Sequence, residues 1–374
     1  MRIGIDLTWI KPQKSGGVQA FIENLIEGFL KLEDNNEYIL FLAEDNQEYL
    51  SKVFKDKRIT NVVCNTEAFN VKKHLLWQNL FQYNVLKKNN IDFCFFPVYE
   101  MPIYKCKKIK NVTTIHDIQA FHYPEYFSKL ENIWFRLGWK TAILNSDKIV
   151  AITEYTKQDL MENFKHKNNI VSIHNPVVLK DSEIEDFELL KEKYNIKKNE
   201  YYYTVSSMHK HKNLITLVKM IKEIKEKNYN IPQKLVISGV GGPNKEKLIE
   251  TIKEMDIEDN IIITNFVSNA ERNSLIKNSN VFLFPSIFEG FGMPPIEAMH
   301  IGAKVITTNC TSLPEVTKGK CNYVHNPFNI NDWIKEIEKI QNEESKKIIF
   351  DEYENTKIAR KYLDLFYEIN KESD

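Results

Sequence analysis

Short runs of strand-forming residues alternate with longer helix-forming stretches along this chain of 374 residues. Many of the strand-like runs are apolar almost throughout, which is typical of a parallel sheet that is covered on both faces. Helical spacing separates them, for example over residues 18–32, 74–88, 212–227 and 269–278. This order predicts an α/β fold of doubly wound parallel sheets. The predicted strands are RIGIDL, YILFLA, IDFCFF, NVTTI, DKIVAIT and NIVSI in the first half, and YYYTVS, KLVIS, NIIIT, NVFLFP and AKVIT in the second.

One charged stretch divides the alternating pattern into two halves. Residues 180–199, KDSEIEDFELLKEKYNIKKN, are poor in strand formers, and we expect a helix from Asp186 to Tyr194 within them. We therefore predict a first domain over residues 1–180, a linker over 181–199 and a second domain over 200–354.

Composition and charge exclude several classes of protein. Lys and Arg balance Asp and Glu at 51 each, so no global attraction to nucleic acid is expected. Five cysteines without CxxC or Cys/His spacing argue against a disulfide framework or a zinc site. The chain has no apolar run near the ~18 residues of a membrane span and no signal-peptide pattern at its start. These features predict a cytoplasmic, globular protein.

The stretch PSIFEGFGMPPIEAMHIG, residues 285–302, combines a flexible loop, a helix start and two carboxylates. Gly290 and Gly292 would let the backbone approach a ligand, and the prolines that follow preset the first turn of a helix. A helix N-terminus binds phosphate, whereas carboxylates repel it. We therefore expect Glu289 and Glu297, the latter placed in the first turn, to accept hydroxyl groups on either side of a diphosphate. The alternative is that Glu297 only caps the helix dipole.

The longer stretch FPSIFEGFGMPPIEAMHIGAKVITTNCTSLPEV resembles the nucleotide-sugar site of retaining GT-B glycosyltransferases of family 4. The resemblance implies two Rossmann-like domains that face each other across a cleft, with the donor held mainly by the second. It also implies that Glu297 binds the ribose diol and Glu289 a hydroxyl of the transferred sugar. The backbone amides of Phe291, Gly292 and Met293 would hold the sugar or the diphosphate.

Two stretches of the first half fit the same resemblance. Gly16 and Gly17, between the first strand and the first helix, would lie beside the diphosphate, although a tight turn explains them as well. His116 ends a strand, where open α/β sheets bind ligands, and the resemblance places it against the donor sugar. The alternative is a structural histidine. We expect Asp117 to support the loop.

The first strand of the second half leads into SSMHKHKNL, residues 206–214. The family commonly has an arginine followed six residues later by a lysine here, and both neutralise the diphosphate. Lys212 matches the lysine, but Ser206 stands at the arginine position. His209 or Lys210 could compensate for the missing charge. The resemblance further implies that the stretches around Gly239 and around Phe266 and Val267 line the nucleotide base.

The chain contains no Asp-x-Asp motif and no metal-ligand cluster. We therefore expect neither metal nor cofactor, with the diphosphate charge met by Lys212, helix N-termini and backbone amides. The predicted reaction is metal-independent hexose transfer, with retention, from a UDP-, GDP- or dTDP-linked sugar to a saccharide acceptor. His116, Glu289 and Lys212 are the predicted catalytic residues. The alternatives are a nucleotide-sugar epimerase of the same architecture and a non-catalytic nucleotide-sugar-binding protein.

Two further expectations concern partners and the C-terminus. Residues 51–150 hold 16 Lys and Arg against 8 Asp and Glu, with KCKKIK at 105–110, and Trp77 and Phe81 add aromatic side chains. These features predict peripheral contact with the inner face of the cell membrane and a lipid-linked acceptor, as in bacterial surface-polysaccharide assembly. The alternatives are a solvated basic face and core positions for both aromatics. The resemblance implies that a C-terminal helix from about residue 355 completes the first domain.

Overall fold

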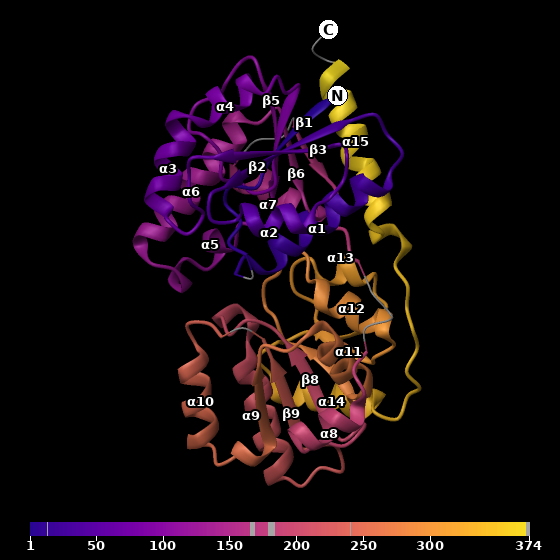
Figure 1. Ribbon diagram of the computed structural model, residues 1–374. Coiled ribbons are helices and arrows are strands. Elements are labelled where there is room, and N and C mark those ends of the chain that lie inside the picture. The colour runs from indigo at the N-terminus through magenta and orange to yellow at the C-terminus, as the bar shows by residue number, and fades with distance from the viewer. Residues whose placement is uncertain (13, 165–168, 179–183, 240, 372–374) are drawn as a thin grey trace. The chain divides into compact units, whose positions relative to one another are not determined.

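The computed structural model describes residues 1–12, 14–164, 169–178, 184–239 and 241–371. The chain divides into two compact units, one of Met1–Val178 with Glu352–Asp374 and one of Leu179–Asp351 (Figure 1). The predicted domain boundary between residues 180 and 181 lies outside the described residues. Each unit is built around one parallel sheet, as the alternating sequence pattern predicts.

The described part of the first unit forms a seven-stranded sheet in the order β3-β2-β1-β4-β5-β6-β7, with every neighbouring pair parallel. Its strands are β1 Arg2–Asp6, β2 Glu37–Ala43, β3 Ile59–Cys64, β4 Phe93–Phe96, β5 Lys110–Ile115, β6 Lys148–Ala151 and β7 Ile170–Ser172. Its helices are α1 Gly16–Lys31, α2 Gln47–Val53, α3 Val71–Leu80, α4 Gln82–Lys88, α5 Gln119–His122, α6 Lys129–Asn145, α7 Glu154–Phe164 and α15 Asn355–Lys371.

Alternation along the strands builds a separate core on each face of this sheet. In β4, Phe93 and Phe95 face a core that α1 and α15 complete. Cys94 and Phe96 face a second core, to which α3, α4, α6 and α7 contribute. Because successive side chains of a strand point to opposite faces, a fully apolar strand is buried on both sides.

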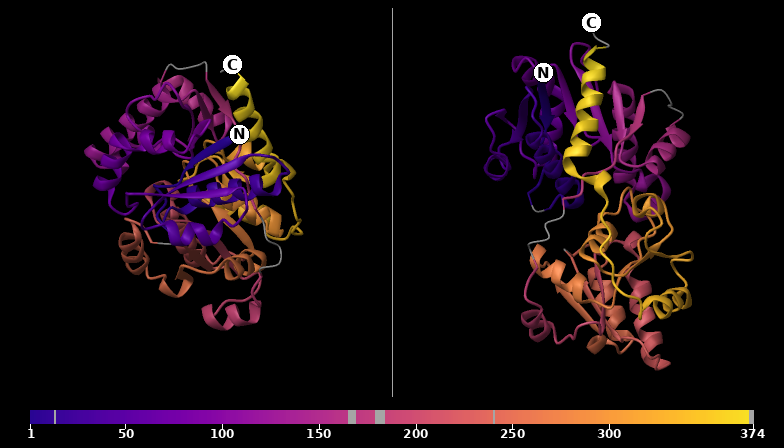
Figure 2. Two further views of the ribbon diagram at one scale, coloured as in Figure 1. Left: turned by 45° about the horizontal axis from the view of Figure 1, so that its top comes forward. Right: turned by 90° about the vertical axis from the view of Figure 1, so that its right-hand side faces the viewer.

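The C-terminal helix α15 belongs to the first unit, where it lies along α1 (Figure 2). Its apolar side is buried, and the Phe366 ring lies 4.5 Å from that of Phe93, centroid to centroid. The two helices approach closely at Gly28, where an added Cβ would lie 2.4 Å from the carbonyl oxygen of Asn355. A side chain at position 28 would therefore push the start of α15 away from α1.

The described part of the second unit forms a six-stranded parallel sheet in the order β10-β9-β8-β11-β12-β13. Its strands are β8 Tyr201–Val205, β9 Lys234–Ser238, β10 Ile261–Asn265, β11 Val281–Phe284, β12 Val305–Thr308 and β13 Asn322–Val324. Its helices are α8 Phe187–Tyr194, α9 Leu214–Glu226, α10 Lys245–Glu254, α11 Asn269–Asn278, α12 Met293–Ile301, α13 Leu313–Thr317 and α14 Ile330–Ile340.

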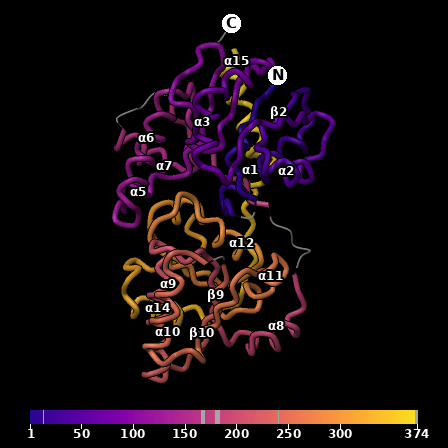
Figure 3. The backbone as a smooth tube through the Cα atoms, turned by 60° about the vertical axis from the view of Figure 1, so that its left-hand side comes forward, coloured from indigo at the N-terminus to yellow at the C-terminus, as the bar shows by residue number. Residues whose placement is uncertain are grey.

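The stretch predicted as a linker contains α8, which packs on the second unit beside α11 (Figure 3). Asp186 caps the helix, as its position before the apolar spacing predicts. The amide of Glu185 donates to the carbonyl of Ala270 at 3.1 Å, and Lys193 pairs with Glu271 at 2.5 Å. Residues 184–194 are therefore an integral part of the second unit.

The order of each sheet reverses at one point, and the predicted site residues follow the strands around it. In the second unit the chain builds β8, β9 and β10 outward and then returns to place β11 on the other side of β8. The first unit does the same at β1 and β4. Open α/β sheets bind ligands at the carboxyl ends of such strands. The stretch at 206–214 follows β8, and the Gly290–Gly292 loop follows β11.

Candidate functional site

The loop after β11 turns into α12 through Gly292, which precedes the helix with a φ of +91°. An added Cβ there would lie 2.6 Å from Cδ2 of Leu313, so only glycine fits this position without a shift. Two prolines follow in the first turn, as the sequence predicts. The expectation that Glu297 lies in this turn is wrong, because α12 begins at Met293 and Glu297 is its fifth residue.

A second segment holds the loop in shape. The amide of Glu289 donates to Oγ1 of Thr311 at 3.0 Å, and the Thr311 hydroxyl donates back to the Glu289 carbonyl at 3.0 Å. Oγ of Ser312 lies 2.9 Å from that same carbonyl and 3.0 Å from the carbonyl of Phe291. Thr311 and Ser312, which the sequence reasoning left without a role, therefore fix the position of Glu289.

Glu289 is paired with Lys212, as Nζ of the lysine lies 2.5 Å from Oε1 of the glutamate. Both side chains are largely buried, with exposed fractions of 17% and 12%. Lys212 ends a short 3-10 turn after β8, and the next residue, Asn213, anchors this turn by donating to the carbonyl of Pro327 at 2.9 Å. The structure thus brings together two of the predicted catalytic residues, and each satisfies the charge of the other.

Glu297 has a cation beside it as well. The guanidinium of Arg272, on α11, lies 3.5 Å from Oε2 of Glu297, and both side chains are mostly buried. Nε of Arg272 is buried and has no hydrogen-bond partner among the described residues. Sequence reasoning missed Arg272, because an arginine within a helix carries no local signal that separates it from a solvated one.

Other predicted donor residues of the second unit lie at the ends of β8, β9 and β10. Gly239 has a φ of +147°, and an added Cβ would lie 2.0 Å from the carbonyl oxygen of Ser206, so these two residues are in close contact. Val267 is buried, whereas the Phe266 side chain is 77% exposed. An exposed aromatic ring next to a glycine-lined strand end is available for stacking.

The histidines of the turn after β8 do not supply charge. Burial lowers the pKa of His209, and the nearby Lys212 lowers it further. Burial, followed by the effect of Lys212, lowers the pKa of His211 much more. Both rings are therefore neutral at physiological pH. If His209 compensates for the missing arginine, it does so as a neutral hydrogen-bond donor and not as a cation.

The predicted residues of the first unit are positioned by α1 and β5. Gly16 and Gly17 form the first turn of α1 and do not precede it, which corrects the sequence assignment. Gly16 has a φ of +54° and open space around it. Nε2 of His116 donates to the carbonyl of Pro97 at 2.9 Å, and burial lowers the pKa of His116 to about 4. Its ring is then neutral near pH 7, with Nδ1 as the acceptor. Asp117 accepts from the amide of Gln119 at 2.9 Å and supports the loop, as predicted.

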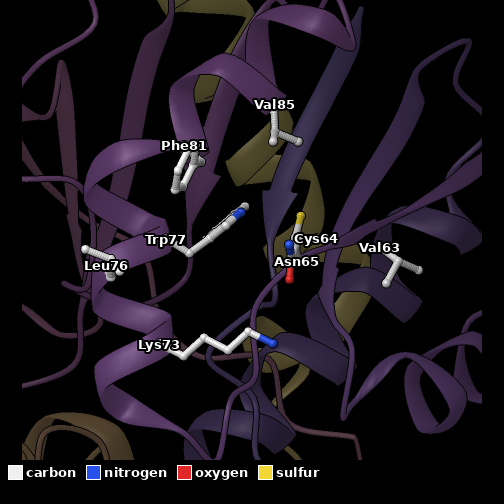
Figure 4. Close-up of a pocket in the computed structure, with 8 residues that line it drawn as sticks. All are labelled: Val63, Cys64, Asn65, Lys73, Leu76, Trp77, Phe81 and Val85. Atoms are coloured by element: carbon white, nitrogen blue, oxygen red, sulfur yellow. The ribbon is translucent and has the colours of Figure 1, made fainter.

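The surface predicted to contact a membrane is only partly as expected. Trp77 is a buried core residue that lines a hollow of about 380 Å³ in the first unit (Figure 4), which confirms the alternative of a core position for this residue, whereas Phe81 is exposed. Within the basic cluster, Lys105 lies 2.9 Å and Lys110 3.8 Å from Oδ1 of Asp147. Part of the basic excess is therefore neutralised locally.

Two family descriptions match the chain. "Glycosyltransferase Family 4" matches residues 15–181, and "Glycosyl transferases group 1" matches residues 186–357. Together the two descriptions cover most of the chain, which belongs to the family 4 (group 1) glycosyltransferases. It has the GT-B fold of two Rossmann-like domains. Among the described residues, the glycosyltransferase has no group of three or more His, Cys, Asp or Glu side chains placed to hold a metal ion.

Named relatives of this glycosyltransferase include enzymes of surface-polysaccharide synthesis. It is 26% identical to the O-antigen chain mannosyltransferase RfbU of Salmonella typhimurium, over 76% of this chain and 75% of that protein. It is also 26% identical to O-antigen chain mannosyltransferase B of Escherichia coli, over 59% of this chain but only 58% of that protein. The crystal structure of Anabaena Alr3699/HepE with UDP and glucose superposes with a TM-score of 0.70 at 12% identity, covering 98% of this chain and 100% of that one.

Proposed function

We propose that this glycosyltransferase moves a hexose from a nucleotide sugar to a saccharide acceptor with retention of anomeric configuration, without a metal ion, in the assembly of a bacterial surface polysaccharide. One observation carries the proposal. The glycine loop before α12 lies between two largely buried glutamates, and each glutamate has a basic side chain beside it. Carboxylates held in this way are strong acceptors for paired hydroxyl groups, and the helix start between them suits a phosphate.

In the proposed complex, Glu297 accepts the two ribose hydroxyls and Glu289 accepts a hydroxyl of the transferred sugar. The loop backbone from Gly290 to Met293 donates to the sugar or the diphosphate. Gly239, Phe266 and Val267 lie at strand ends where the base would sit, and the exposed Phe266 ring offers a stacking surface.

The reaction breaks the bond between the anomeric carbon and the diphosphate oxygen. The acceptor oxygen then bonds to that carbon on the same face, and its proton passes to the departing phosphate. Lys212 and the N-terminus of α1 at Gly16 and Gly17 stabilise the negative charge that develops. Nδ1 of His116 accepts a hydrogen bond from a sugar hydroxyl, because Nε2 of the same ring already donates to the carbonyl of Pro97. Catalysis then rests on positioning and electrostatics, and no carboxylate nucleophile is needed.

The acceptor is proposed to be a lipid-linked saccharide, presented at the inner face of the cell membrane. The names of the O-antigen mannosyltransferases support this choice, since O-antigen chains are surface polysaccharides. We propose that the membrane contact is peripheral. No helix of the described residues is both long enough and apolar enough to cross a bilayer. The same names make GDP-mannose the first donor to test.

The test is a transfer assay with the full chain, GDP-mannose and UDP-, dTDP- and ADP-linked hexoses, and short mannoside acceptors. NMR of the purified product reports the configuration at the new linkage. An inverted product would contradict retention. A donor that is isomerised in the absence of acceptor would favour the epimerase alternative. Tight donor binding with no turnover on any acceptor would favour a non-catalytic binding protein.

A further inference from the structure

Helix α6 has two apolar faces, and only one of them is covered. The inner face is buried in the first unit's core through Trp139, Ala142 and Ile143. The outer side carries five large apolar side chains, each between 44% and 80% exposed, on an element at the outside of its unit (Figure 3). They are Leu130, Ile133, Trp134, Leu137 and Leu144.

Helical geometry places these five side chains in one stripe. At 100° per residue, Leu130, Ile133, Trp134, Leu137 and Leu144 fall within a sector of about 100°, opposite the buried face. Single exposed apolar residues are ordinary, but five large ones on one face of a single helix mark a surface that another body covers.

A basic row runs along one edge of the stripe. Lys129, Arg136 and Lys140 all lie on the same flank of α6, and all three are exposed. The helix has one acidic residue, Glu131, on the other flank, where its carboxylate closes the capping box by accepting from the amide of Ser128 at 2.8 Å. The outer face is therefore apolar along its centre and positive along one side.

We propose that this outer face of α6 is a membrane-contact surface that lies on an anionic bilayer. Amphipathic helices bind in the interface by burying apolar side chains, with tryptophan among them, while lysine and arginine reach the phosphate groups. Charge complementarity favours this partner over a second copy of the chain. An antiparallel symmetric contact would set the three cations of one α6 beside the three of the other, and Glu131 is the one acidic residue of this helix.

This inference rests on the proposed function in one respect, because a lipid-linked acceptor gives the contact its purpose. The inference also places the membrane contact on α6, whereas the sequence analysis placed it on residues 74–88 and 105–110. There Trp77 is buried, and Lys105 and Lys110 are bound to Asp147. On α6, by contrast, both the apolar stripe and the basic row are exposed.

Vesicle flotation of the full chain tests the surface. We expect binding to vesicles that contain phosphatidylglycerol, little binding to pure phosphatidylcholine, and release by salt. The variant Ile133→Ser/Trp134→Ser/Leu137→Ser should bind about tenfold or more weakly, because it removes the centre of the stripe. The matched control Leu76→Ser/Leu80→Ser/Phe81→Ser removes three equally exposed apolar side chains of the other candidate surface and should bind like the wild type.

A charge series separates the two basic regions. Lys129→Gln/Lys140→Gln should lower binding and its salt dependence, whereas Lys105→Gln/Lys110→Gln should change neither. Absence of binding to the anionic vesicles, or equal losses in the α6 and control variants, would overturn the proposal. So would light scattering that shows a wild-type dimer and a monomeric stripe variant, because the stripe would then be a self-association surface.

Transfer to a short soluble mannoside distinguishes this proposal from the proposed function. If the stripe variant keeps full soluble transfer and loses flotation, both proposals hold. If the wild type transfers sugar but does not float, the surface fails and the function stands. If flotation depends on α6 but no donor is turned over, the surface stands and the function fails. Circular dichroism of each variant confirms that it folds.

Discussion

Neutralising Lys212 should destabilise the second unit, and neutralising Glu289 as well should not add to the loss and should restore up to half of it. The pair is held at 2.5 Å with both side chains largely buried, so Lys212→Met leaves a carboxylate without a counter-charge. Breaking a fully buried pair costs about 3–5 kcal/mol, and the partial exposure here lowers the expected cost to about 2 kcal/mol. Glu289→Gln should cost about the same, because it leaves an unpaired ammonium.

The double variant Lys212→Met/Glu289→Gln has no unpaired charge. We expect it to cost about 1–2 kcal/mol, which corresponds to a coupling energy of about 2–3 kcal/mol between the two residues. Because a chain of two units need not unfold in one step, amide hydrogen exchange in peptides from β8 and β11 is the suitable measurement. The matched control is Lys339→Met, an exposed lysine that pairs with Glu336 on α14 and should change stability by less than about 0.5 kcal/mol.

Additive costs in the double variant would refute the reasoning, because they would mean that the two charges do not depend on each other. The same variants connect stability to activity. In Lys212→Met, turnover should fall more than affinity for the nucleoside diphosphate, since the lysine acts on charge that develops during bond breaking. An equal fall in turnover and in affinity for the nucleoside diphosphate would mean that Lys212 acts in ground-state binding.

Four further outcomes are expected. Glu297→Ala should weaken nucleoside diphosphate binding about tenfold or more in calorimetry, and Glu289→Ala should not weaken it, because only Glu297 contacts the ribose in the proposed complex; unchanged affinity in Glu297→Ala would remove that assignment. Transfer should survive EDTA, and a loss that Mg²⁺ or Mn²⁺ restores would contradict metal independence. Deletion from Asn355 onward should make the first unit sensitive to protease, because α15 completes its core, and full resistance would contradict this. Acidification should destabilise the first unit between pH 6.5 and 4, because the unfolded chain protonates His116 before the folded chain does, and His116→Gln should reduce that slope in thermal melts at each pH.

The sheet strands that the sequence predicts all form, and the two further strands of the described residues, β3 and β13, lie at sheet edges. In β3, residues 60 and 61 are Thr and Asn, and Cys64 is the one fully buried residue of the strand. β13 is three residues long. A strand at an edge has a neighbour on one side and less cover, so it needs no continuous apolar run. A search for continuous apolar runs, which detects buried central strands, therefore misses both β3 and β13.

The candidate site divides in the same way into local and distant features. The loop at Gly292 could be predicted because its glycines, prolines and glutamates are neighbours in the chain. The contact between Arg272 and Glu297 could not, since it joins two helices whose packing no short pattern specifies. The α6 stripe was missed for a related reason. Leu130, Ile133, Trp134 and Leu137 have the spacing of a core face, and only the structure shows that the core lies on the other side.

The turn after β8 has few positive charges that could neutralise the diphosphate. Ser206 stands where the resemblance leads one to expect an arginine, and burial keeps His209 and His211 neutral. Lys212 is then the largely buried cation of this turn, and in the structure it is bound to Glu289. A sugar hydroxyl that donates to Glu289 would compete with that bond and free Lys212 to face the phosphate. We therefore expect sugar recognition and leaving-group stabilisation to depend on each other through this one ion pair.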